Sequence, residues 1–262
     1  MEQNLPKIYV LNLDRSPDRW TEFIQSFEPI GLDIIRVTAV DGKELVLPHV
    51  DYNEHAYQLY HGKRTGSGTV GCYFSHIKAL RQFLESNEEI ALICEDDVSA
   101  KPELPQILNA VLSFKKHWDL LRLNCLHIPT NVSVQKLDFG YRLTVPVYWA
   151  GGTGAYLVNR KAAERIVTLS LPMYLPYDHA FEQNWRMNFT IMMVIPFPIV
   201  LNINSGHSTI QATIQEKLSF FKRYLFSPLL PYRGLMTCQR WRKQIGTALW
   251  YRLFPPSGNS ES

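Results

Sequence analysis

The chain has 262 residues, of which 46% are hydrophobic and 19% charged, and its formal net charge is +3. This length suits one large domain, or one domain with an appendage, and the composition excludes a mainly disordered chain. The sequence shows neither a signal-peptide pattern nor an apolar run of membrane-spanning length, and its four cysteines lack C-x-x-C spacing, so we expect a cytoplasmic protein with reduced thiols.

Apolar segments that alternate with amphipathic ones predict an α/β fold, with a mostly parallel sheet flanked by helices. The predicted strands cover residues 7–13, 34–40, 90–94, 120–124, 143–147, 154–158 and 191–195. The predicted helices cover residues 18–27, 71–86, 102–116, 160–169 and 181–188. Residues 45–68 are expected to be irregular.

The charge is unevenly distributed along the chain. Residues 215–262 carry eight basic and two acidic side chains, whereas residues 1–214 carry 19 basic and 22 acidic ones. We therefore expect a main domain over residues 1–214 and a helical, basic and aromatic extension over residues 215–262. Basic side chains mixed with large aromatic rings suit an anionic membrane surface. The alternative is a helix that packs its rings on the main domain, and no motif indicates nucleic acid as a partner.

Three consecutive carboxylates, Glu95, Asp96 and Asp97, directly follow the predicted strand over residues 90–94. In open α/β sheets, ligands bind beyond the carboxyl ends of the strands. Adjacent carboxylates repel one another unless a cation shares them. Mg²⁺ and Mn²⁺ prefer oxygen ligands and are commonly shared with phosphates, so the triplet predicts a metal-bridged diphosphate. The alternative is a solvated loop, or acids at the start of the helix near Pro102.

Residues 66–71 (GSGTVG) fit the G-x-G-x-x-G pattern of dinucleotide-binding proteins, and a predicted helix and strand follow. A dinucleotide-dependent oxidoreductase is therefore an alternative. The preceding residues 60–65 are polar, however, and the pattern requires a buried strand at that place.

Six segments together resemble the motifs of glycosyltransferase family 25, the bacterial lipooligosaccharide galactosyltransferases and their relatives. They are residues 9–19 (YVLNLDRSPDR), 39–42 (AVDG), 68–76 (GTVGCYFSH), 93–98 (ICEDDV), 152–160 (GTGAYLVNR) and 175–178 (LPYD). They occur in the family's order and cover roughly residues 7–210. Thr69 and Cys94 stand where the family often has Glu and Leu, and residues 211–262 match no family motif.

The resemblance implies a GT-A-like, Rossmann-like fold and the transfer of a hexose with inversion at the anomeric carbon. The donor would be a UDP-hexose, most often UDP-galactose, and the acceptor a lipid-linked oligosaccharide of lipooligosaccharide or lipopolysaccharide. The extension would then hold the enzyme at the cytoplasmic face of the cell membrane. An inactive adaptor that keeps the fold and binds glycan or membrane is a further alternative.

The resemblance also assigns donor-binding residues. Asn12, Arg15 and Arg19 would lie beside the nucleotide, where guanidinium groups suit diphosphate oxygens. Asp41 would accept a hydrogen bond from uracil or ribose, and Asp96 would belong to the same donor site. The alternative is a purely structural role: Arg19 would be an exposed residue in the first turn of a helix, and Asp41 a residue of an Asp-Gly turn.

The remaining assignments concern the metal ion, the reaction and the sugars. His207 would complete the metal site of Glu95 and Asp97. Asp178 would be the general base that takes the acceptor's proton, unless it only caps the following helix. The residues expected beside the sugar or acceptor, each with a structural role as the alternative, are His76, Tyr156 and Trp149.

Overall fold

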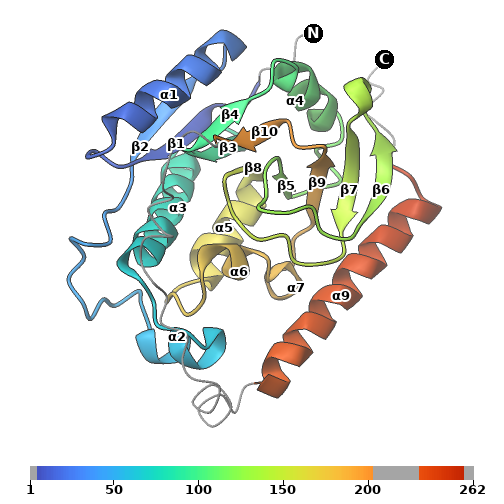
Figure 1. Cartoon of the computed structure of the whole chain (residues 1–262). Coiled ribbons are helices and arrows are strands. Elements are labelled where there is room, and N and C mark those ends of the chain that lie inside the picture. The colour runs from blue at the N-terminus through green and yellow to red at the C-terminus, as the bar shows by residue number, and fades with distance from the viewer. Residues whose placement is uncertain (1–4, 203–229, 257–262) are drawn as a thin grey trace.

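The computed structural model describes residues 5–202 and 230–256, and its centre is an eight-stranded sheet with the order β2-β1-β3-β8-β5-β9-β7-β6 (Figure 1). The strands of this sheet are β1 (Ile8–Asn12), β2 (Ile34–Thr38), β3 (Ile90–Glu95), β5 (Leu120–Arg122), β6 (Asn131–Lys136), β7 (Arg142–Pro146), β8 (Ala155–Asn159) and β9 (Ile191–Ile195). A separate antiparallel pair joins β4 (Val98–Ala100) to β10 (Ile199–Leu201).

Helices cover both faces of this sheet. The helices are α1 (Pro17–Phe27), α2 (Glu54–His61), α3 (Ser67–Glu85), α4 (Leu104–Leu112), α5 (Arg160–Leu169), α6 (Tyr177–Phe181), α7 (Asn184–Met187) and α9 (Leu230–Leu253), with short 3₁₀ turns η1 (Glu28–Ile30) and η2 (Asp138–Gly140). One hydrophobic cluster contains buried side chains of α1 and α4, and a second contains those of α3, α5 and α6. The predicted α/β architecture, a sheet flanked by helices, is confirmed.

The seven predicted strands are all present, but the pairing is more mixed than the sequence indicates. Strand β1 is parallel to β2 and β3, and β5 is parallel to β9. Strand β8 is antiparallel to β3 and β5, and β7 is antiparallel to β9 and β6. A strand's own pattern of apolar residues reports burial, not the direction of its neighbour, so this mixture was not predictable from local sequence.

Three local predictions were wrong. Residues 45–68 contain α2, whose start is capped by the Asn53 side chain accepting from the Ala56 amide (2.9 Å). Residues 181–188 do not form one helix, because the chain divides there into α6 and α7. The strands β4, β6 and β10 were not predicted.

The glycine-rich segment at residues 66–71 serves packing. A Cβ atom on Gly42 would lie 1.8 Å from the Ser67 carbonyl oxygen, and one on Gly71 would lie 2.6 Å from that of Val40. Only glycine lets the loop after β2 approach the first turns of α3 this closely. Residues 62–66 form a bend, one isolated β-bridge residue and a loop, not the buried strand that the dinucleotide-binding pattern requires.

Helix α9 supplies the described part of the basic extension, and it lies along the main domain beside β6 and β7 (Figure 1). Gln244 of α9 is buried, where it donates to the Pro146 carbonyl (3.0 Å) and accepts from the Asn184 side chain (3.3 Å). The predicted boundary between residues 214 and 215 lies outside the described residues. Among the helices of the described ranges, none combines the length and apolarity needed to cross a bilayer.

Candidate functional site

A cavity of about 100 Å³ lies beyond the carboxyl ends of β1, β2 and β3. In the parallel register Asn12 pairs with Thr38 and Leu11 with Glu95, so the three strands end side by side. The cavity lining includes six of the predicted site residues, namely Arg15, Arg19, Asp41, Glu95, Asp96 and Asp97. These six side chains come from three separate sequence segments and meet where the sheet topology predicts a ligand site.

Arg19 supplies positive charge to the acid triplet. Its Nη2 atom lies 2.7 Å from Asp96 Oδ1 and 3.0 Å from Asp97 Oδ2. Beside this pair, Arg15 Nε lies 2.5 Å from Asp41 Oδ2, and the Arg15 guanidinium lowers the pKa of that carboxyl. Arg15 and Arg19 are thus paired with carboxylates at the cavity that they line. Their guanidinium groups are also suited to bind phosphate oxygens there.

Asn12 is fully buried and holds Asp96 in place. Its Nδ2 atom donates to Asp96 Oδ2 (2.7 Å), and its Oδ1 atom accepts from Arg36 Nη2 (2.7 Å). Sequence analysis missed Arg36, because only the register of β1 against β2 shows that this strand residue reaches Asn12. The structure therefore places Asn12 behind Asp96 and not on the cavity wall.

His76 and Tyr156 similarly support Glu95 from the core. The Thr153 hydroxyl donates to Glu95 Oε1 (2.6 Å), and His76 Nε2 lies 3.5 Å from the same oxygen. The buried His76 ring stacks on Tyr177 at 4.2 Å, and its Nδ1 lies 3.2 Å from the Tyr156 hydroxyl. Neither His76 nor Tyr156 lines the cavity.

Burial and mutual repulsion perturb the carboxylates of the triplet. Burial, reinforced by the charge of Glu95, raises the pKa of Asp97 to about 7, and burial also raises the pKa of Asp96. Burial would raise the pKa of Glu95 as well, but its interactions with His76 and Thr153 outweigh this and lower it. Such a cluster gains stability when a further positive charge enters it.

The donor atoms present fit a divalent cation. Asp97 Oδ1 is buried without a hydrogen-bond partner among the described residues. Oxygen ligands from Glu95 and Asp97 suit Mg²⁺ or Mn²⁺. Cys72 Sγ, a His76 ring nitrogen and a Glu95 oxygen also lie within 4.8 Å of one another, a donor set that sequence analysis did not identify. His207, the third predicted ligand, lies outside the described residues.

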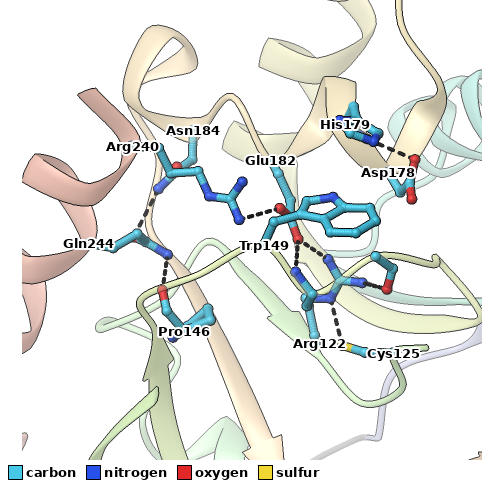
Figure 2. Close-up of polar contacts among 12 residues, drawn as sticks. Arg122, Cys125, Pro146, Trp149, Asp178, His179, Glu182, Asn184, Arg240 and Gln244 are labelled. Atoms are coloured by element: carbon cyan, nitrogen blue, oxygen red, sulfur yellow. Dashed lines mark hydrogen bonds and ion pairs between the residues drawn. The ribbon is translucent and has the colours of Figure 1, made fainter. Parts of the chain in front are cut away.

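Asp178 lies in the first turn of α6, near this cluster. The burial of Cys72 and the charges of Glu95, Asp178 and Asp97 around it raise the pKa of that thiol. Asp178 Oδ1 accepts from the His179 amide (2.9 Å), as Figure 2 shows. Its Oδ2 accepts from the Gly152 amide (3.1 Å). The N-cap of α6 is Pro176, so the alternative role of Asp178 as the cap is not what the structure shows.

A buried ion pair holds the loop that contacts Asp178. Arg122 of β5 pairs with Glu182 (Figure 2). Arg122 also donates to the carbonyl oxygens of Gly151 and Gly152. Glu182 also accepts from the Ala150 amide (3.3 Å). Both glycines have positive φ, and the Trp149 ring lies against Gly151. The only sequence signal for this pair is the arginine within the otherwise apolar β5.

Comparison with known proteins identifies relatives of the chain. The model of glycosyltransferase family 25, described as an LPS biosynthesis protein family, matches residues 5–181. A glycosyltransferase 25 family member of Drosophila melanogaster is 31% identical over 209 residues, covering 74% of this chain and 34% of that protein.

Two other relatives differ in the activity that their names state. Procollagen galactosyltransferase 1-B of Xenopus laevis is 25% identical, over 68% of this chain and 30% of that protein. A probable inactive glycosyltransferase 25 family member 3 of Rattus norvegicus is 28% identical, over 66% of this chain and 32% of that protein. The chain thus spans about a third of the length of these curated relatives.

Proposed function

The chain belongs to glycosyltransferase family 25, and we propose that it transfers a hexose from a UDP-sugar to a saccharide acceptor with inversion. The observation that carries the proposal is the cavity at the sheet edge, where the acid triplet meets Arg15, Arg19 and Asp41. Galactose is the proposed hexose, in keeping with the relatives named galactosyltransferases. The proposed acceptor is a lipid-linked oligosaccharide, in keeping with the family's description as LPS biosynthesis proteins.

In this proposal, separate residues would bind the metal ion, bind the diphosphate and position the carboxylates. Glu95 and Asp97 would hold Mn²⁺ or Mg²⁺, with His207 as the proposed third ligand. The bound ion would neutralise charge on the departing diphosphate. Arg15 and Arg19 would bind the diphosphate oxygens, which requires Arg19 to turn away from Asp96 and Asp97. Asn12 and His76 would act as positioning residues for Asp96 and Glu95.

Asp41 and Asp178 would contact the nucleoside of the donor and the acceptor hydroxyl, respectively. Asp41, whose carboxylate Arg15 keeps ionised, would accept a hydrogen bond from the ribose or uracil. Asp178 would take the proton of the acceptor hydroxyl while that oxygen attacks the anomeric carbon. The Gly152 amide fixes one oxygen of the Asp178 carboxylate, which orients the side chain for this transfer.

Removal of divalent cations tests the proposal. UDP-galactose turnover, measured as UDP release, is expected to fall about tenfold or more with EDTA and to return when Mn²⁺ or Mg²⁺ is added. Asp97→Asn is expected to raise the Mn²⁺ concentration needed for half-maximal turnover by about tenfold or more, since it removes an anionic ligand. Asp138→Asn, an exposed aspartate on η2, is the matched control.

Full turnover in EDTA, together with an unchanged Mn²⁺ response of Asp97→Asn, would contradict the metal site. Absence of turnover with all of the UDP-, GDP- and CMP-sugars would favour the alternative of an inactive adaptor. The inactive relative of Rattus norvegicus gives that alternative its specific support.

We further propose that α9 attaches the protein to an anionic membrane surface on the cytoplasmic side. The helix exposes large apolar side chains, namely Leu235, Trp241, Ile245, Leu249, Trp250 and Leu253. Arg242 and Arg252 are exposed on the same helix. Each basic residue near such a surface contributes about 1 kcal/mol to binding, and apolar burial adds to it.

Co-sedimentation with phosphatidylglycerol vesicles tests this attachment. The unmodified chain is expected to sediment with them at low salt and to remain in solution with phosphatidylcholine vesicles. Replacing Leu249, Trp250 and Leu253 together by Ser is expected to abolish sedimentation, because the inserting side chains are lost. Equal sedimentation of this triple variant and the unmodified chain would end the proposal.

A further inference from the structure

A second cavity, of about 270 Å³, lies between α9, the Trp149 loop and the chain around α6 and α7. Its aromatic lining residues are Tyr60, Tyr148, Trp149, Trp185 and Trp241. Its polar lining residues are His179, Glu182, Gln183, Thr237 and Arg240. The volume is just below the about 300 Å³ at which pockets for drug-sized ligands begin, so it suits one or two sugar rings. The α9 wall lies beyond residues 5–181, the range of the family match.

The second cavity adjoins the proposed general base through one loop. Trp149 lies 4.9 Å from the His179 ring, measured between ring centroids, and both residues line the cavity. Asp178, the neighbour of His179, accepts from the Gly152 amide of the same loop. A saccharide held in the cavity would therefore end close to the Asp178 carboxylate.

We propose that this cavity binds a neutral pyranose of the acceptor, next to the sugar that receives the transferred hexose. This inference rests on the proposed transferase function. Aromatic walls with a few fixed polar groups are typical of small-molecule sites, and aromatic rings match the apolar faces of pyranose rings. The buried N–H groups Trp149 Nε1 and Gln183 Nε2 lack a hydrogen-bond partner among the described residues. Both nitrogens are buried, so their side chains would have to turn before a sugar hydroxyl could accept from them.

The charges around the cavity favour a neutral ligand. Arg240 Nη2 lies 2.8 Å from Glu182 Oε2, and Glu182 is also paired with Arg122. Arg240, the arginine on the cavity wall, is thus already engaged by a carboxylate that it shares with Arg122. An anionic sugar would have to compete with Glu182 for Arg240, at the cost of breaking a buried ion pair.

Contacts with the main domain hold α9 in place as one wall of this cavity. Arg240 and Gln244 both reach from α9 to buried groups of the main domain (Figure 2). Trp241 lies on the same helix and lines the cavity. Although the extension matches no family motif, in this arrangement it supplies part of the acceptor site.

Saccharide binding to the full chain tests the inference. The probes are the methyl pyranosides of galactose, glucose, mannose and N-acetylglucosamine and the disaccharide lactose, measured by saturation-transfer NMR at millimolar concentration. At least one probe is expected to bind, and Trp149→Ala and Trp241→Ala are each expected to raise its Kd about tenfold or more. Phe139→Ala, an exposed aromatic side chain on η2, is the control and should leave the Kd unchanged. Thermal unfolding of each variant verifies that it folds.

The outcomes separate this inference from the proposed function. If no probe binds, or if the Phe139 control weakens binding as much as Trp241→Ala, the acceptor subsite is overturned. Turnover of UDP-galactose by the unmodified chain would leave the transferase proposal standing in that case. If the probes bind through Trp149 and Trp241 but no sugar nucleotide is turned over, the cavity is a saccharide site and the transferase proposal fails.

Discussion

Replacing Asp178 by Asn is expected to lower kcat for transfer by about 100- to 10,000-fold, the usual contribution of a general base. The amide cannot accept the proton of the attacking hydroxyl at neutral pH. The side-chain oxygen of Asn can still accept from either the Gly152 or the His179 amide, so the fold around α6 should persist. The measurement is kcat for transfer from UDP-galactose, with the Kd of UDP determined separately.

Two comparisons show whether a fall in kcat reports proton transfer. The Kd of UDP should stay within about threefold, because Arg15, Arg19 and Asp41 line the donor cavity and Asp178 does not. The Asp138→Asn variant should retain full kcat, since that side chain is exposed on η2. If Asp178→Asn keeps kcat within a factor of about three, another group takes the proton and Asp178 serves only to anchor Gly152.

The sequence predicted the acid side of the site because the relevant pattern is local. Glu95, Asp96 and Asp97 follow an apolar strand, and any strand of that kind in an α/β sheet delivers its next residues to the sheet edge. Arg15 and Arg19 reach the same edge because β1 is parallel to β3 and the loop after β1 begins there.

Local sequence could not show which polar side chains face the cavity. Asn12 ends β1 and was expected beside the nucleotide, yet it is fully buried behind Asp96. Tyr156 was expected to form a sugar wall, and its hydroxyl instead lies between His76 and the Tyr177 hydroxyl. A shift of one residue in the register between neighbouring strands changes which way a side chain at the strand end points. That register is set by long-range pairing, which local sequence does not show.

The sequence also did not show which residues hold the loop that contacts Asp178. Arg122 and Glu182 are 60 residues apart, and each stands in a segment that gives no sign of the other. Arg122 and Glu182 come together only because β5 lies beside β9 and α6 packs on the sheet. Buried charges need a partner, but the sequence does not say which one.

Glu182→Gln is therefore expected to destabilise the protein by about 3–5 kcal/mol, the typical cost of breaking a buried ion pair on one side. Arg122 is 1% exposed and would keep its charge without a compensating carboxylate, and Arg240 would lose the same partner. For a chain of this size, 1 kcal/mol corresponds to about 2–4 °C in Tm, so Tm should fall by roughly 10 °C. Urea unfolding and calorimetry measure both quantities.

The control for this prediction is the same substitution in an exposed ion pair. Glu89 lies 3.0 Å from Lys115, but its side chain is 79% exposed, so Glu89→Gln should cost less than about 1 kcal/mol. Glu182 also orders the Trp149 loop through Arg122 and the Ala150 amide, so Glu182→Gln should shift tryptophan fluorescence below the unfolding transition. Equal losses for the two variants would mean that Glu182 stabilises no more than a surface charge. The acceptor side of the site would then need another source of rigidity, because Trp149, Asp178 and α9 all depend on this one carboxylate or on the loop that it holds.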